Sequence, residues 1–502
     1  MNIAFRVDAS IQIGTGHFMR CLTLADALKM RGARTRFVSR HMPEHLREML
    51  NAKGHEFSPL DSIPSAEAVD DSSYAHWLGV CQAQDATDTS HALSDQTWDW
   101  LIVDHYALDA RWETVLRNAA MHILAIDDIA DRQHDCDVLL DQNFYADIGS
   151  RYIGKVPSHC KLLLGPHYAL LREEFRRAHE QVKPRTGIVK RVLVFFGGVD
   201  ADNLTSRAIE SLANIGNSAL HVDVVIGTQH PHRNQIETAC VDHDFICHVQ
   251  TDQMAELMAA ADLAIGAGGS ATWERCCLGV PALTVCAADN QRKQITDAAS
   301  EGMLYAPEAG DDLTLMLKRH VIALMENDCL RHVISRNGMQ AVDGCGVSRV
   351  VGNLGCNGID IRTARPDDSE KLFEWRNHPS VRAVSRNAEL ITWENHQKWF
   401  ASVLASPDRL LLIGYRDGSP VGVVRFDTQD DEAEVSIYLV PGIKQSGQGR
   451  DLLQSAESWF IINRPEMCKI CANVLGGNER SQHLFLNASY QVESTRYFKR
   501  LC

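Results

Sequence analysis

Short apolar runs alternate with amphipathic stretches along the first two-thirds of the chain, the rhythm of strands and helices in a parallel α/β sheet. The first repeat is a strand pattern over residues 3–9 followed by a helical pattern over 18–32. The alternation restarts after a polar stretch with Pro and Gly near 180–189. We therefore predict two doubly wound Rossmann-like domains, at residues 1–180 and 188–352.

The pattern changes after a glycine-containing break near 350–360. Two helical segments come first there, then three strands, a glycine-rich turn and a further helix, at residues 369–378, 393–404, 409–417, 421–427, 433–440 and 449–461. Helices grouped before strands are typical of a mixed α+β fold. We place this third domain at residues 359–502.

Composition limits the function classes. A chain of 502 residues accommodates about three domains of roughly 100–200 residues each. The net charge of −15 argues against nucleic acid or an anionic membrane as partner, so any anionic ligand has to be held by local dipoles. No basic segment followed by an apolar one opens the chain, and no run of about 18 apolar residues occurs, so we expect a cytoplasmic protein.

Cysteine usage indicates reduced thiols. Fifteen cysteines are scattered through the chain, unlike the pattern of a small disulfide scaffold. The one C-x-x-C, Cys468 and Cys471, falls in a strand pattern that would point the two thiols to opposite faces. We therefore expect no metal and no redox centre.

A first candidate site follows the first strand. Gly14 and Gly16 precede His17 at the start of the first helix, where a glycine loop and a helix N-terminus meet. The positive end of the helix dipole disfavours an imidazolium, and a neutral imidazole can take a proton from water. Asp8, on the first strand, could orient this histidine or a ligand. Capping roles for His17 and Asp8 remain alternatives from spacing alone.

A second candidate site is glycine-rich. Glycines at the end of a strand let successive backbone amides face a diphosphate. An acidic residue on the following helix can accept hydrogen bonds from ribose hydroxyls. The candidate ligands are Gly197, Gly198, Gly268, Gly269, Ser270, Glu274, Asn290 and Gln291. Ordinary strand-to-helix turns are the alternative at both glycine pairs.

These motifs together resemble the UDP-2,4-diacetamido-2,4,6-trideoxy-β-L-altropyranose hydrolase family of pseudaminic acid biosynthesis. The strings that carry the resemblance are RVDASIQIGTGHFMRCLTLADAL, DHYALDARWE, AIDDIADRQHDCDVLLDQN, LGPHYALLREEF, FFGGVDADNLT and GAGGSATWERCCLGVPAL followed by NQ. The resemblance implies a glycosyltransferase-B-like pair of domains, cleavage of the bond between sugar C1 and UDP, and a catalytic role for His17.

The last domain resembles the GCN5-related N-acetyltransferases. Glycine amides at a helix N-terminus can hold the diphosphate of coenzyme A. Lys444 stands where that family usually has Gln or Arg, and Phe485 where many relatives have a tyrosine acid. We propose Glu434 as base and Tyr490 or Tyr438 as acid, with a packing or rim role as the alternative for each. The residues assigned to acetyl-CoA are Lys444, Gly447, Gly449, Arg450, Asn478 and Ser481.

The two resemblances together imply a bifunctional enzyme. Its last domain would N-acetylate the 4-amino group of a UDP-linked sugar with acetyl-CoA, and its first two would then release UDP. Water attack from the face opposite UDP would invert C1. A UDP-sugar glycosyltransferase, a non-catalytic sugar-nucleotide sensor and a hydrolase of an epimeric sugar, as in legionaminic acid synthesis, remain alternatives.

Overall fold

The computed structural model describes twelve segments of the chain. They are residues 1–10, 12–61, 74–217, 219–287, 291–308, 312–355, 359–385, 387–416, 418–443, 447–464, 466–475 and 478–493. The chain divides into two compact units, Met1–Ala27 with Ala33–Val350, and Leu28–Gly32 with Val351–Cys502.

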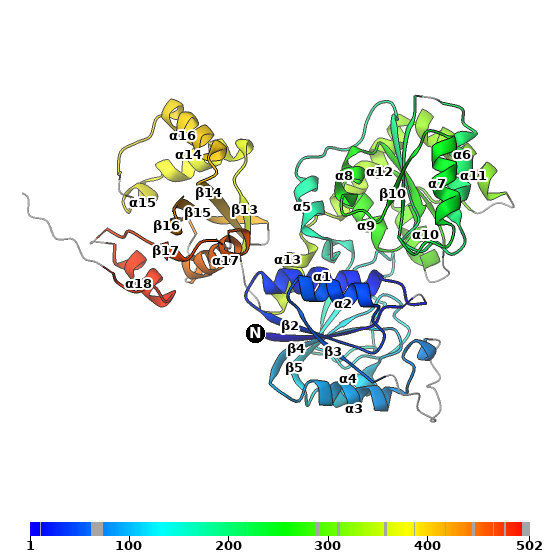
Figure 1. The fold of residues 1–502 in the computed structure, drawn as a ribbon, viewed down its shortest axis with the longest axis horizontal. Coiled ribbons are helices and arrows are strands. Elements are labelled where there is room, and N and C mark those ends of the chain that lie inside the picture. The colour runs from blue at the N-terminus through cyan, green and yellow to red at the C-terminus, as the bar shows by residue number, and fades with distance from the viewer. Residues whose placement is uncertain are drawn as a thin grey trace, which may run out of the picture. The chain divides into compact units, whose positions relative to one another are not determined.

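The first sheet has seven parallel strands in the order β3-β2-β1-β4-β5-β6-β7. Helices α1 (Gly16–Lys29) and α2 (Glu44–Ala52) cover one face, and α3 (Gln82–Ala92) and α4 (Ala110–Leu116) the other (Figure 1). The strands are β1 (Asn2–Val7), β2 (Arg34–Ser39), β3 (Glu56–Pro59), β4 (Trp98–Asp104), β5 (Ala120–Ile126), β6 (Val138–Asp141) and β7 (Lys161–Leu164).

Helix α1 forms where the apolar period predicts it. Phe18, Cys21, Leu22, Ala25 and Leu28 recur at helical spacing, and each is at most 2% exposed. The helix therefore buries one continuous apolar face, and this packing fixes its N-terminus at the carboxyl edge of the sheet.

The second sheet has five parallel strands in the order β10-β9-β8-β11-β12. Helices α6 (Leu204–Ala213), α7 (Arg233–Asp242) and α11 (Leu313–Glu326) lie on one side of it, and α8 (Met254–Ala260), α9 (Ser270–Cys277) and α12 (Asp328–Ala341) on the other (Figure 1). The strands are β8 (Arg191–Phe195), β9 (His221–Ile226), β10 (Ile246–Val249), β11 (Leu263–Ala267) and β12 (Ala282–Val285).

Further helices in the first unit join or follow these two sheets. They are α5 (Glu173–His179), α10 (Arg292–Ser300) and α13 (Gly346–Asn353), with the 3₁₀ turns η1 (Ala75–Trp77) and η2 (Pro166–Tyr168). Both parallel sheets confirm the predicted doubly wound Rossmann-like class, whereas the limits at 180 and 188 stay a prediction.

The second unit is the predicted α+β domain. Its sheet runs β13-β14-β15-β16-β17, antiparallel except for the last pair, which is parallel. Helix α17 (Gln448–Asn463) packs on one face, and α14 (Ser369–Asn377) and α16 (Trp393–Ala405) on the other. The remaining elements are β13 (Asp360–Thr363), η4 (Pro366–Asp368), α15 (Pro379–Arg382), β14 (Arg409–Arg416), β15 (Ser419–Gln429), β16 (Glu432–Leu439), β17 (Lys469–Cys471) and α18 (Glu479–Asn487).

Within the described segments, none of the helices has the length and apolar character needed to cross a membrane.

Candidate active sites

His17 stands where the strand order of the first sheet reverses. Strand β1 ends at Val7, and His17 is the second residue of α1. The neighbouring strand β4 ends at Asp104. The chain winds outward from β1 to β3 on one side and from β4 to β7 on the other. Ligands of open α/β sheets bind at such a switch point, outside the carboxyl ends of the strands.

The imidazole of His17 is hydrogen-bonded to Asp104. Nδ1 of His17 lies 2.6 Å from Oδ1 of Asp104, and the two residues are only 9% and 1% exposed. A carboxylate can only accept, so the bond to Asp104 places a proton on Nδ1, and Nη2 of Arg20, 3.1 Å from the same nitrogen, then contacts it without donating. Among the described residues Nε2 has no hydrogen-bond partner. The ring is therefore arranged as a base toward a ligand.

A third residue fixes Asp104. Nε and Nη2 of Arg20 each donate to one carboxylate oxygen of Asp104, both at 2.6 Å. Burial alone would raise the pKa of Asp104, but Arg20 and then His17 outweigh burial and hold that pKa well below its usual value. Asp104 therefore stays ionised beside His17. Neither Asp104 nor Arg20 was predicted as a site residue, because Asp104 lies 87 residues from His17 in sequence and the contacts of Arg20 depend on Asp104.

The predicted glycines Gly14 and Gly16 shape the turn that leads into α1. Gly14 has φ +76° and its amide donates to the carbonyl of Ser10 at 2.8 Å. A Cβ on Gly14 or Gly16 would meet nothing within 4 Å. The turn is therefore open on the side where these side chains would stand, which suits the approach of a ligand.

Asp8 lies in a different network. Its Oδ1 accepts from the Ser39 hydroxyl and the Arg40 amide, both at 2.8 Å, and Arg6 Nη1 lies 2.8 Å away. Burial would raise the pKa of Asp8, but Arg6 dominates and lowers it well below its usual value. These contacts match the loop-capping alternative. The structure brings Asp104, not Asp8, to the ring of His17.

The two predicted glycine turns flank the switch point of the second sheet. Gly197 and Gly198 follow β8, and Gly268 and Gly269 follow β11, the strand beside it. Gly269 has φ +86° and ψ −158°, a conformation that essentially only glycine adopts. It precedes the first residue of α9, so a glycine turn and a helix N-terminus coincide at this edge. Both features favour an anion.

Polar side chains gather beside this turn. Ser270 is exposed at the first position of α9. A Cβ on Gly268 would stand 3.0 Å from Oε1 of Gln291, so that amide lies against the turn, and its Oε1 is buried with no described partner. Burial raises the pKa of Glu274 on α9, with Arg172 opposing the shift from 3.8 Å. Asn290 lies outside the described residues.

A buried arginine that no sequence motif predicts binds the backbone of this turn. Arg275 is 2% exposed and its Nη2 donates to the carbonyl of Ala267 at 2.8 Å. Burial lowers its pKa to about 10. Next to it, Trp273 Nε1 donates to Oδ1 of Asn143 at 2.9 Å. This bond ties α9 to the segment that follows β6 of the first sheet.

In the last domain, β16 and β17 pair over only three positions. The register runs from Glu432 opposite Lys469 to Glu434 opposite Cys471, whereas β16 pairs with β15 along its whole length. The described part of β17 ends there, so residues 435–439 of β16 have no described strand on that side. An extended ligand can add to such an open strand edge.

The open edge leads to the predicted coenzyme A loop. Gly447 has φ +89°, caps the 16-residue helix α17, and has nothing within 4 Å of its Cβ position. Gly449 and Arg450 lie in the first turn of α17, and Arg450 is exposed. Lys444 lies outside the described residues. The described part of the loop fits a diphosphate, because the helix N-terminus and open glycine are both present.

The predicted base Glu434 and one predicted acid, Tyr438, lie on β16, whereas the other predicted acid, Tyr490, follows α18. Glu434 is the last residue of β16 that pairs with β17, so it stands where the strands part. Tyr490 donates its hydroxyl to Glu457 of α17 at 2.6 Å, and burial, then Glu457, raise its pKa. Burial also raises the pKa of Tyr438, against Arg376 and Arg425. Asn478 caps α18 by accepting from the Ser481 amide at 3.1 Å.

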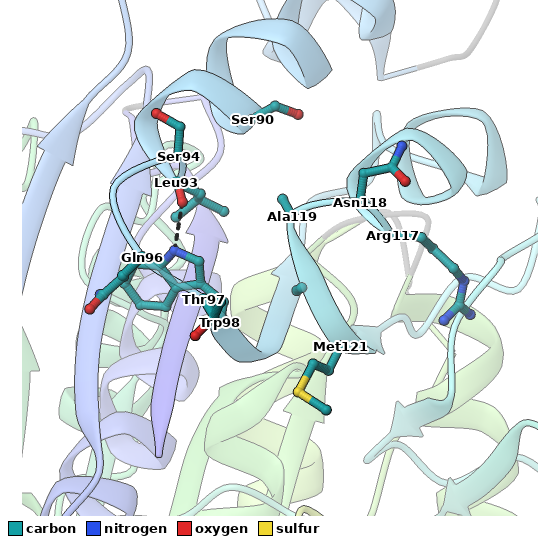
Figure 2. Close-up of a pocket in the computed structure, with 11 residues that line it drawn as sticks. Ser90, Leu93, Ser94, Gln96, Thr97, Trp98, Arg117, Asn118, Ala119 and Met121 are labelled. Carbon is teal, nitrogen blue, oxygen red and sulfur yellow. Dashed lines mark hydrogen bonds between the residues drawn. The ribbon is translucent and has the colours of Figure 1, made fainter.

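A separate depression of about 420 Å³ lies at the opposite edge of the first sheet, near the amino ends of β4 and β5 (Figure 2). Trp98 in its lining donates Nε1 to the carbonyl of Leu93 at 2.9 Å. Arg117 is the one charged lining residue, and it is paired with Asp135 and Asp137. This edge is not where doubly wound sheets bind ligands.

No group of three or more His, Cys, Asp or Glu side chains in the described ranges is placed to hold a metal ion.

Family matches define the class of the chain. Residues 191–302 match the glycosyltransferase family 28 C-terminal domain, and residues 359–490 match the acetyltransferase (GNAT) domain. The chain thus joins a glycosyltransferase-B-like pair of Rossmann-like domains to a GNAT acetyltransferase domain, as the sequence predicted.

Individual relatives narrow this class. The chain is 26% identical over 304 residues, 60% of its length and 97% of the relative, to the UDP-2,4-diacetamido-2,4,6-trideoxy-beta-L-altropyranose hydrolase of Campylobacter jejuni. It is 23% identical to the spore coat polysaccharide biosynthesis protein SpsG of Bacillus subtilis, over 70% of this chain and 98% of that one. An uncharacterized protein of Methanocaldococcus jannaschii is 21% identical over 98% of this chain and 97% of its own. The predicted resemblance to the hydrolase is confirmed.

Proposed function

We propose that the first unit hydrolyses UDP-2,4-diacetamido-2,4,6-trideoxy-β-L-altropyranose to UDP and the free sugar. The observation that carries the proposal is the 2.6 Å bond between His17 Nδ1 and Asp104, which leaves Nε2 as a base at the switch point. Similarity to the Campylobacter jejuni hydrolase supports this substrate.

The reaction needs one aimed water and a stabilised leaving group. Nε2 of His17 removes a proton while the water oxygen bonds to C1, and the bond from C1 to the UDP oxygen breaks with its electron pair on UDP. The imidazolium, held by Asp104, then returns its proton to solvent. Amides at the turn of Gly268, Gly269 and Ser270 stabilise the growing charge on the diphosphate. Attack from the face opposite UDP inverts C1.

A glycosyltransferase is the second candidate, favoured by the match to the family 28 domain. It would use the same diphosphate turn but deliver the sugar to an acceptor hydroxyl. Release of UDP in buffer without any acceptor separates the two reactions. An epimeric sugar substrate is tested in the same assay by comparing kcat/KM for the two epimers.

The direct test replaces the base. His17→Asn and His17→Leu lower kcat for UDP release by about 10²- to 10⁴-fold, the usual contribution of a general base. The Kd for UDP, measured by calorimetry, stays within about threefold, since diphosphate contacts are elsewhere. His159→Asn is the matched control, because its side chain is 58% exposed in the same domain. Retention of kcat within tenfold of wild type would overturn the role of His17.

The second unit is proposed to N-acetylate the 4-amino group of the UDP-linked precursor. Acetyl-CoA supplies the activated acyl group as co-substrate. The open edge of β16 and the amides at Gly447 and the start of α17 would hold it. Glu434, where β16 and β17 part, takes the proton from the attacking amine, and Tyr490 or Tyr438 protonates the departing thiolate. The 4-acetamido product of this unit is the substrate of the first one.

A further inference from the structure

The His17–Asp104 pair belongs to a closed ring of five side chains. Arg20 lies three residues after His17, hence on the same face of α1. It holds both oxygens of Asp104, and its Nη1 donates to Oδ2 of Asp128 at 2.9 Å. Asp128 follows β5, the strand beside β4.

Tyr106 completes the ring. Its hydroxyl donates to the other oxygen of Asp128 at 2.5 Å. Its aromatic ring packs against the imidazole of His17, with centroids 4.7 Å apart and planes at 84°. The contacts therefore run from His17 through Asp104, Arg20, Asp128 and Tyr106 back to His17.

Every nitrogen of the Arg20 guanidinium is engaged in this ring. Nε and Nη2 bind Asp104 and Nη1 binds Asp128, and the residue is 8% exposed. Three of the five guanidinium N–H donors are thus taken by Asp104 and Asp128, and Nη2 also lies 3.1 Å from Nδ1 of His17. The two hydrogen bonds from Nε and Nη2 also prevent the Asp104 carboxylate from rotating, so a lone pair of Oδ1 stays directed at Nδ1 of His17.

We propose that Arg20 and Asp128 are positioning residues, which fix the ring plane and the Nδ1-protonated tautomer of His17. The inference rests on the proposed hydrolysis. It states that Arg20 and Asp128 affect kcat for UDP release and not the affinity for the substrate, because neither side chain contacts the substrate. Packing by Tyr106 stops the imidazole from rotating away from Asp104.

The test uses the full chain with Arg20→Gln, Arg20→Lys and Asp128→Asn. Arg20→Gln lowers kcat for UDP release about 10²-fold and leaves KM within about threefold, because the imidazole of His17 loses its orientation while the substrate still binds. Arg20→Lys recovers part of kcat, since lysine restores the positive charge but not the bidentate hydrogen bonding of a guanidinium. Asp128→Asn lowers kcat about tenfold, because Arg20 keeps Asp104. Arg117→Gln, which loses an arginine paired to Asp135 and Asp137 in the same domain, keeps wild-type kcat.

A second readout does not depend on turnover. In ¹⁵N-histidine spectra, the resonance of His17 is assigned as the one that His17→Asn removes. In wild type this resonance shows a proton on Nδ1, and in Arg20→Gln it is shifted or broadened beyond detection. An unchanged resonance together with unchanged kcat would overturn the proposal. So would a raised KM at unchanged kcat, since Arg20 would then bind substrate. If wild type releases no UDP, the proposed hydrolysis fails, while the spectra still decide the tautomer and its dependence on Arg20.

Discussion

His134 is a buried histidine between two carboxylates, away from His17. Its Nδ1 lies 2.8 Å from Glu113 and its Nε2 3.7 Å from Asp127. Burial alone would lower the pKa of His134, but the neighbouring carboxylates of Asp127 and Glu113 outweigh burial and raise it to about 9. The folded protein therefore holds this ring as an imidazolium at neutral pH.

This raised pKa predicts a pH dependence of stability. Because the folded pKa lies above the unfolded one, the stabilisation is complete below pH 6.5 and is lost as the pH rises through about 9. The loss amounts to about 3 kcal/mol in the free energy of unfolding. Urea unfolding of wild type and His134→Gln from pH 6 to 10 measures it. The difference between the two proteins shrinks with rising pH, and a constant difference would contradict the assignment.

At the scale of single residues, glycine motifs predict the candidates close to them in sequence but not the side chains that contact these candidates from other elements. His17 and Gln291 were predicted because each lies beside a glycine turn or strand end. Asp104 and Arg20 were not predicted because Arg20 on α1 contacts Asp104 at the end of β4 only once β4 pairs beside β1, which spacing does not reveal. Asp8 was chosen for its place on β1, but its partners are Arg6 and the segment after β2.

At the scale of elements, glycine turns at two helix N-termini carry the proposed anion sites. Helix α17 begins at a glycine with positive φ and an open Cβ position, beside a strand whose edge is partly unpaired. Helix α9 also begins after a glycine with positive φ, Gly269, although Nε2 of Gln291 lies 3.3 Å from its Cβ position. Strand and helix periods predicted these elements, whereas the parting of β16 and β17 was not predicted, because it depends on register.

Substitution at α17 tests its ligand. Gly447→Ala raises the KM for acetyl-CoA about tenfold, because a methyl group then stands where amides approach the diphosphate. UDP release from the diacetamido substrate is unchanged. Gly216→Ala is the control for backbone strain, since Gly216 also has positive φ, +72°, and open space around its Cβ position. Equal KM values of the two variants for acetyl-CoA would show that the diphosphate does not bind at this turn.

At the scale of the whole molecule, one acidic chain carries both proposed reactions. With a net charge of −15, long-range attraction does not concentrate anionic substrates. The two proposed anion sites consist instead of glycine amides and a helix N-terminus, at α9 and at α17. The acetylation proposed for one unit would produce the acetamido sugar nucleotide that the other unit is proposed to cleave.

The central claim is that water attacks C1 of the sugar, and oxygen-18 water tests it most directly. The chain is incubated with the UDP-diacetamido sugar in H₂¹⁸O without any acceptor, and the UDP formed is examined by mass spectrometry and ³¹P NMR. Attack at C1 breaks the bond between carbon and oxygen, so the released UDP carries no oxygen-18. UDP that carries one oxygen-18 in its terminal phosphate would show attack at phosphorus and contradict the account.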